Sequence, residues 1–130
     1  MEKFLYNKVA VIDDNRDVAE FMPMLLGSKG AAEFFSKCTR NKEEALQFIL
    51  EHNPDAIILD MHLTDDEEYD GIWIANQLSK NSFSGKVMIH SGSGHLSEMR
   101  KLIRLSDVHI PGKDFDAVVR CLFGTCNCTG

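Results

Sequence analysis

The chain has 130 residues, of which 44% are hydrophobic, and it carries a formal net charge of −6. These values are typical of one globular domain, and the negative charge argues against a nucleic-acid-binding surface. No apolar run is long enough to span a membrane and no signal-peptide pattern is present, so we expect a cytoplasmic protein that binds neither nucleic acid nor membrane.

Taken in chain order, short apolar runs alternate with amphipathic segments. The apolar runs predict strands at residues 8–12, 31–37, 55–60, 86–90 and 108–110, of which the second is the weakest. Apolar residues at helical spacing predict helices at residues 15–29, 41–53, 72–78, 96–105 and 116–123. We expect a single domain of residues 1–125 followed by a frayed tail of residues 126–130.

Local signals mark the ends of two predicted helices. Asn15 is a suitable N-cap for the first helix, and Asn41 followed by Glu44 has the form of a capping box for the second. Pro23 lies inside the first helix. Because a proline in a helix interior costs roughly 3 kcal/mol, we expect a kink or irregular first turns there.

Five strands that alternate with five helices predict an α/β fold with a doubly wound parallel sheet. Right-handed crossovers then place helices on both faces of the sheet. The run at residues 56–59 contains no polar residue, which is typical of a strand buried on both faces. Open sheets of this kind carry their chemistry at the carboxyl ends of the strands.

Polar residues follow four of the predicted strands at that position. Asp13 and Asp14 end the first strand, Asp60 the third and Ser91 the fourth, and Lys113 follows the fifth. We therefore expect three carboxylates, a hydroxyl and an ammonium group to meet at one edge of the sheet. Unit charges about 4 Å apart repel by about 4 kcal/mol at an effective dielectric constant of 20. The carboxylates would thus need a cation, and Mg²⁺ suits a small carboxylate cluster.

These motifs, in this order, resemble those of the response-regulator receiver domains of two-component signalling. The resemblance extends from residue 9 to about residue 123 and implies the flavodoxin-like receiver fold. It also implies one role for each site residue. Asp60 would be the phosphoacceptor. The Mg²⁺ ligands would be Asp13, Asp14, Asp60 and the backbone carbonyl of His62, while Ser91 and Lys113 would contact the phosphoryl group.

The resemblance implies partners as well. The phosphoryl donor would be a phosphohistidine on a sensor histidine kinase or a histidine phosphotransfer protein. Output would pass by protein contact through residues 94–123, and the same surface could support a homodimer. The chain would promote only its own phosphotransfer and dephosphorylation, so it would not be an enzyme in the ordinary sense.

The sequence departs from the receiver pattern at several positions. The loop after Asp60 is longer than usual and carries the acidic run of residues 65–68. Ile110 stands where many receivers have an aromatic residue, and Asp114 stands where they usually have proline. Without the aromatic residue, the change in shape on phosphorylation would be smaller or would follow another route.

Three alternatives stay open at this stage. A degenerate receiver could act as a docking module that needs no phosphorylation, and Ile110 and Asp114 would favour that reading. A Mg²⁺-dependent phosphatase of small molecules would use the same carboxylates, although such enzymes more often carry a second Asp where His62 stands here. A flavodoxin-like flavin binder would share the architecture, but the acidic crevice would repel a flavin phosphate.

Overall fold

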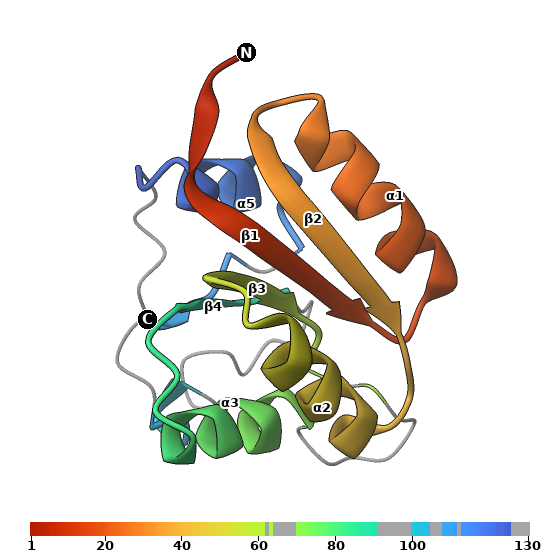
Figure 1. Ribbon diagram of the computed structural model, residues 1–130, viewed down its shortest axis with the longest axis vertical. Helices are drawn as coiled ribbons and strands as arrows, with labels where there is room; N and C mark the ends of the chain where they lie inside the picture. The colour runs from red at the N-terminus through yellow and green to blue at the C-terminus, as the bar shows by residue number, and fades with distance from the viewer. Residues whose placement is uncertain (62, 64–69, 91–99, 105–107, 112, 126–130) are drawn as a thin grey trace.

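Five parallel strands form one sheet in the order β2-β1-β3-β4-β5, and helices cover both of its faces (Figure 1). The computed structural model describes residues 1–61, 63, 70–90, 100–104, 108–111 and 113–125. The strands are β1 (Lys3–Asp13), β2 (Ala31–Cys38), β3 (Ala56–Leu59), β4 (Lys86–Ile89) and β5 (Val108–His109). The helices are α1 (Arg16–Gly27), α2 (Lys42–His52), α3 (Asp70–Lys80) and α5 (Phe115–Leu122). The predicted doubly wound parallel sheet is confirmed.

Two predicted segments cannot be compared with the structure in full. Half of the helix predicted at residues 96–105 lies outside the described residues, and so does the tail of residues 126–130. In the described half only Arg100 is helical and residues 101–104 are not, so the helix ends earlier than predicted. Within the described part of the chain, no helix combines the length and the apolar character needed to cross a membrane.

The two faces of the sheet bury separate apolar clusters, because successive side chains of a strand point to opposite faces. Ile57 and Leu59 of β3 belong to the cluster formed with α2 and α3. Ile58 belongs to the cluster formed with α1 and α5. All four residues of β3 are buried, so the central strand is covered on both faces, as its unbroken apolar sequence predicted.

Strand β1 is longer than predicted, since it begins at Lys3 and not at residue 8. In this first half β1 pairs with β2 alone, because its pairing with β3 begins at Val9. Phe4 is buried against the ring of Phe123, with the two ring centroids 4.5 Å apart, whereas Leu5 is 64% exposed. This half of the strand is therefore covered on one face only, and it lacks the continuous apolar run on which the prediction relied.

Helix α1 is α-helical from Arg16 through Pro23 to Gly27, so the irregular first turns that the proline led us to expect are absent, while the alternative of a kink stays a prediction. Asn15 is the N-cap, as predicted, and its side chain accepts the Asp17 N–H at 2.9 Å. Met22 and Leu26 are buried on either side of the proline. Burial of this apolar face outweighs the local cost of Pro23, since most helix stability in proteins comes from tertiary packing.

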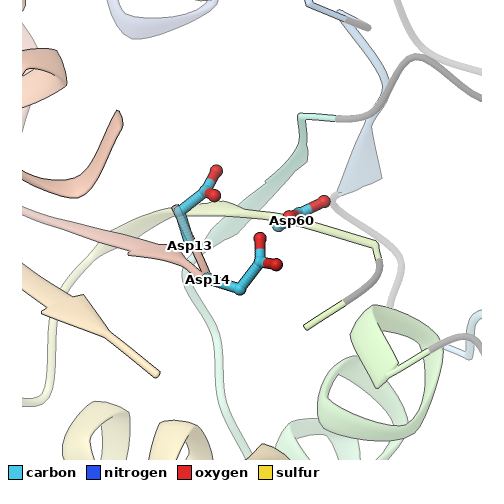
Figure 2. Close-up of side chains that lie close together, drawn as sticks. All are labelled: Asp13, Asp14 and Asp60. Carbon is cyan, nitrogen blue, oxygen red and sulfur yellow. The ribbon is translucent and has the colours of Figure 1, made fainter. Parts of the chain in front are cut away.

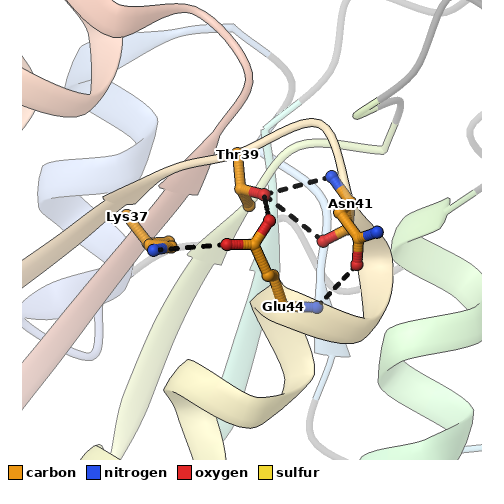
Figure 3. A network of polar contacts seen from close by, with 4 residues as sticks. All are labelled: Lys37, Thr39, Asn41 and Glu44. Carbon is orange, nitrogen blue, oxygen red and sulfur yellow. Dashed lines mark hydrogen bonds and ion pairs between the residues drawn. The ribbon is translucent and has the colours of Figure 1, made fainter.

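The N-terminus of α2 is held by a polar network that only partly matches the predicted capping box (Figure 3). The Asn41 side chain accepts the Glu44 N–H at 2.8 Å, as the box requires. The reciprocal bond is replaced, because the Asn41 N–H donates to the Thr39 hydroxyl at 3.1 Å. Glu44 instead accepts the Thr39 hydroxyl at 3.2 Å and lies 3.7 Å from the Lys37 ammonium. Thr39 thus joins α2 to β1, since its own N–H donates to the Asp13 carbonyl at 3.1 Å.

Candidate functional site

Three carboxylates gather at the carboxyl ends of β1 and β3 (Figure 2). Asp13 is the last residue of β1, Asp14 follows it, and Asp60 follows β3. One carboxylate oxygen from each lies within 4.8 Å of the other two. Backbone pairing carries Asp60 into this position, because the Asp60 N–H donates to the Ile12 carbonyl at 3.0 Å. We refer to Asp13, Asp14 and Asp60 as the three-carboxylate cluster.

The surroundings of Asp13 in the cluster shift the pKa of its carboxyl upward. Burial of this side chain, which is 6% exposed, raises the pKa of its carboxyl, and the neighbouring Asp14 carboxylate raises it further. The Asn15 N–H, which donates to Asp13 at 2.9 Å, and the positive charge of Lys113 act in the opposite direction. The net upward shift means that burial, with a smaller contribution from Asp14, disfavours the ionised form of Asp13, and a divalent cation bound by carboxylate oxygens would favour that form.

Lys113 lies close enough to the cluster for its charge to affect it. The lysine side chain is exposed, and its ammonium lowers the pKa of both Asp13 and His90. The structure therefore gathers three of the expected site residues, Asp13, Asp14 and Asp60, and places Lys113 within electrostatic reach of them. The remaining two, Ser91 and His62, lie outside the described residues.

His90 is a neighbour of the site that is not among the predicted site residues. It follows β4 and is 7% exposed, and its buried Nδ1 has no hydrogen-bond partner among the described residues. Burial lowers the pKa of His90, and Lys113 adds to the effect. His90, Lys113 and Phe115 line a groove of about 340 Å³ together with side chains of α1. His90 lies two residues after Met88, which is buried in the cluster with α1 and α5. Because side chains two residues apart on a strand point to the same face, this spacing is the sequence signal that places His90 on the α1 and α5 face of the sheet.

The loop after Asp60 is anchored at its base in a way the sequence did not reveal. Asp70 precedes the helix predicted at residues 72–78, but it is the first residue of α3 and is 2% exposed. Its carboxylate accepts the Leu63 N–H at 3.0 Å. The Gly71 N–H donates to the Met61 carbonyl at 2.9 Å. Helix α3 therefore begins two residues earlier than predicted, because these contacts recruit Asp70 and Gly71 into its first turn.

Gly71 also allows α3 to approach the backbone that follows β3. A Cβ atom at this position would lie 3.0 Å from the Met61 Cα and 3.1 Å from the Asp60 carbonyl oxygen. Both neighbours are backbone atoms, which cannot move aside as a side chain could. The glycine is therefore required by close packing.

Two of the departures from the receiver pattern have local explanations. Ile110 is half-buried and packs against the cluster on the α2 and α3 side of the sheet. Asp114 is the N-cap of α5, where its carboxylate accepts the Ala117 N–H at 3.2 Å. An N-cap aspartate supplies an acceptor that proline would lack.

The fold and the site together define a class of doubly wound α/β domains with acidic side chains at the carboxyl ends of adjacent strands. The family model for the response regulator receiver domain matches residues 9–118. The chain belongs to this receiver-domain family, which acts in signalling and is not a class of conventional enzymes.

Solved receiver structures share the fold at low sequence identity. A DNA-binding response regulator of the LuxR family from Staphylococcus aureus is 20% identical, with a TM-score of 0.76 over 92% of this chain and 98% of that chain. The receiver domain of the Francisella response regulator 1452 is 22% identical, with a TM-score of 0.67 over 91% of this chain and 97% of that chain. The BeF3-activated receiver domain of Klebsiella pneumoniae RstA is 17% identical, with a TM-score of 0.66 over 90% of this chain and 98% of that chain. No curated protein matches the sequence.

Proposed function

We propose that this chain is a response regulator that accepts a phosphoryl group on Asp60 from a phosphohistidine, with Mg²⁺ held by Asp13, Asp14, Asp60 and the His62 carbonyl. The three-carboxylate cluster is the observation that carries the proposal, because it places a nucleophilic oxygen among the oxygen ligands that Mg²⁺ prefers. The donor is a sensor histidine kinase or a histidine phosphotransfer protein. Output passes by protein contact through residues 94–123, a surface that could also support a homodimer.

The residue types suit in-line phosphoryl transfer. A carboxylate oxygen of Asp60 forms the new O–P bond while the N–P bond of the phosphohistidine breaks, and the electron pair of that bond stays on the imidazole nitrogen. Such a transfer depends on position and charge neutralisation more than on proton transfer. Mg²⁺, when bound, would supply positive charge at the phosphoryl oxygens. Lys113 would contribute its ammonium and Ser91 a hydrogen bond.

The surface next to the cluster favours a protein donor over a small phosphate ester. Phe21, Met24 and Leu25 of α1 are 51%, 66% and 52% exposed. Phe21 and Leu25 also border the groove to which Lys113 belongs. Because exposed apolar patches are typical of protein-interaction sites, we propose that the donor contacts α1 while its phosphohistidine reaches Asp60.

Intact mass spectrometry after incubation with acetyl phosphate tests the phosphoryl acceptance. The expected result is one base-labile phosphoryl adduct that requires Mg²⁺ and disappears in the Asp60→Asn variant. An adduct that persists in Asp60→Asn would show that Asp60 is not the acceptor.

Two further readouts separate the alternatives. Steady turnover of a small phosphate ester such as p-nitrophenyl phosphate would favour a phosphatase, whereas a receiver should form the adduct without such turnover. Absence of both the adduct and Mg²⁺ binding would favour a docking module that works without phosphorylation.

A further inference from the structure

A groove of about 250 Å³ borders helix α3. The described residues that line it are Trp73, Asn76, Gln77 and Lys80 of α3, together with Arg104. The four α3 residues recur at helical spacing, so they share one face of the helix. None of the predicted site residues is among them, and the groove is therefore a feature of its own, distinct from the three-carboxylate cluster.

Positive charge is concentrated in this groove. Lys80 and Arg104 are exposed, and neither makes an ion pair with a described residue. The described lining contains no carboxylate, although the chain as a whole has a net charge of −6. The Lys42 ammonium lies 5.0 Å from the centre of the Trp73 ring and adds to the positive charge nearby. The groove is thus a local cationic surface on an acidic protein.

The Asn76 side chain holds Arg104 beside α3. Its Nδ2 donates to the Leu102 carbonyl at 3.0 Å, and its Oδ1 accepts the Arg104 N–H at 2.8 Å. These two bonds fix the backbone of a short segment to the helix before any partner binds. Such preorganisation reduces the conformational entropy that association would otherwise cost.

Apolar side chains accompany the cations. Trp73 is half-buried and packs against the core cluster on the α2 and α3 side of the sheet, so its ring is held in place. Leu102, whose carbonyl Asn76 holds, is 56% exposed. Tryptophan and arginine are the residue types that most often anchor contacts between proteins. The composition of this surface therefore favours a protein segment as its ligand.

We propose that this groove is a docking surface for an acidic segment of a partner protein, whose carboxylates pair with Lys80 and Arg104 while an apolar side chain contacts Trp73. Charge complementarity selects the occupant, because only an anionic segment would neutralise both cations. Arg104 lies within residues 94–123, so the inference rests on the proposed function for the role of the partner and adds α3 to that output surface. Exposed ion pairs of this kind govern selectivity and weaken as salt is added.

The fluorescence of Trp73 reports on the groove directly, because it is the only tryptophan in the chain. The experiment is a titration of the wild type with a short blocked peptide of glutamate and leucine, beside the same peptide with glutamine in place of glutamate. We expect a saturable change in Trp73 emission with the glutamate peptide alone. Its affinity should fall as NaCl is raised from about 0.05 M to about 0.5 M, since salt screens exposed charges.

Arg104→Glu and Lys101→Glu form a matched pair of variants. Both residues are exposed and both substitutions change the net charge equally, but of the two only Arg104 lines the groove. Arg104→Glu should raise the dissociation constant of the glutamate peptide at least about tenfold by placing like charges together, whereas Lys101→Glu should stay within about threefold of wild type. Asn76→Ala should raise it by roughly twofold to tenfold, because Arg104 must then be ordered on binding.

Three results would overturn the inference. Equal affinities of Arg104→Glu and Lys101→Glu would place the contact outside the groove. A wild type whose Trp73 emission does not respond to the glutamate peptide would have no such docking surface. A response to ATP without one to the peptide would make the groove a site for small anions. Phosphoryl acceptance by Asp60 is measured separately, so none of these results bears on the proposed phosphotransfer.

Discussion

At the scale of single residues, the site places ionisable groups where burial and neighbouring charge oppose their charged forms. The Asp13 carboxyl and the His90 imidazole have pKa values shifted in opposite directions, upward for the acid and downward for the base, and burial is the largest cause of both shifts. Each shift links folding stability to pH, because the native and unfolded states then bind protons differently. Two predictions follow from the signs of these shifts.

Replacing Asp13 with Asn should stabilise the metal-free protein at neutral pH. The raised pKa means that the native state holds the Asp13 proton more tightly than the unfolded state does. The free energy of unfolding of the wild type therefore falls as the pH rises from the unfolded-state pKa of Asp13 through its higher native-state pKa. Removing one charge from the three-carboxylate cluster should raise the free energy of unfolding by about 1 kcal/mol at pH 7. Urea denaturation at pH 7 and at pH 4 measures this, and the gain should shrink at the lower pH.

Mg²⁺ provides the complementary test of the same variant. A saturating concentration should stabilise the wild type by mass action and affect Asp13→Asn much less. Asp55→Asn is the control, since it removes a carboxylate that holds two backbone N–H groups and should gain nothing. Lower stability of Asp13→Asn than of wild type at pH 7 without Mg²⁺ would show that repulsion in the cluster does not limit stability.

Replacing His90 with Leu should flatten the loss of stability in weak acid. The lowered pKa of His90 means that the unfolded state takes up a proton near pH 6.5 before the native state does, so wild-type stability falls as pH drops below that value. In weak acid, the free energy of unfolding of the variant should rise relative to that of the wild type by up to about 1.4 kcal/mol for each unit by which the pKa of His90 is lowered. Thermal unfolding between pH 5 and pH 7.5 measures the difference, and parallel profiles would refute the prediction.

At the scale of elements, α3 approaches the end of β3 and holds Met61 and Leu63, the described residues that follow Asp60. The helix begins with Asp70 and Gly71, and both residues contact the backbone that follows Asp60. Helix α2 is tied to the same end of the sheet through Thr39 and the Asp13 carbonyl. Two helices on one face thus brace the two strands that carry the three-carboxylate cluster.

Replacing Gly71 with Ala should push α3 away from the site. The added Cβ would lie about 3 Å from backbone atoms of Asp60 and Met61, so the helix or the strand end must shift. Overpacking of this kind typically destabilises by about 1–3 kcal/mol, and the displaced Asp60 should accept phosphoryl groups more slowly from acetyl phosphate. Chemical denaturation and adduct formation over time measure the two effects.

Gly27 provides a matched control for that substitution. It ends α1, and a Cβ atom there would lie 3.9 Å from a ring carbon of Phe34, which is an ordinary contact. Gly27→Ala should be neutral or stabilising, because alanine favours the helix by up to about 1 kcal/mol relative to glycine. Equal losses in the two variants would mean that close packing against Asp60 is not the reason for Gly71.

At the scale of the whole molecule, the parallel sheet brings together residues that are far apart in the chain. Asp13, Asp60 and His90 each end a strand or follow one directly, and the strand order places β1, β3 and β4 side by side (Figure 1). Because all strands are parallel, their carboxyl ends share one edge of the sheet. Buried apolar clusters cover both faces of the sheet and hold in place the strands that carry the site.

The sequence by itself determined the elements and the residues that compose the candidate site. Apolar runs marked the buried strands, such as β3, because such a strand needs no polar face. Asp13, Asp14 and Asp60 were recognisable because each stands at the point where an apolar run stops. Asn15 and Asn41 marked helix starts through capping, which is a local interaction.

Only the tertiary structure decided the features that depend on contacts between distant segments. Strand β1 extends back to Lys3 because β2 provides its partner, and α1 passes through Pro23 because its apolar face is buried. Asp70 reads as one more acid of a solvated loop until the fold brings it to the Leu63 N–H. Periodicity and capping describe near neighbours, whereas burial and long-range hydrogen bonds exist only once the sheet and its helices have come together.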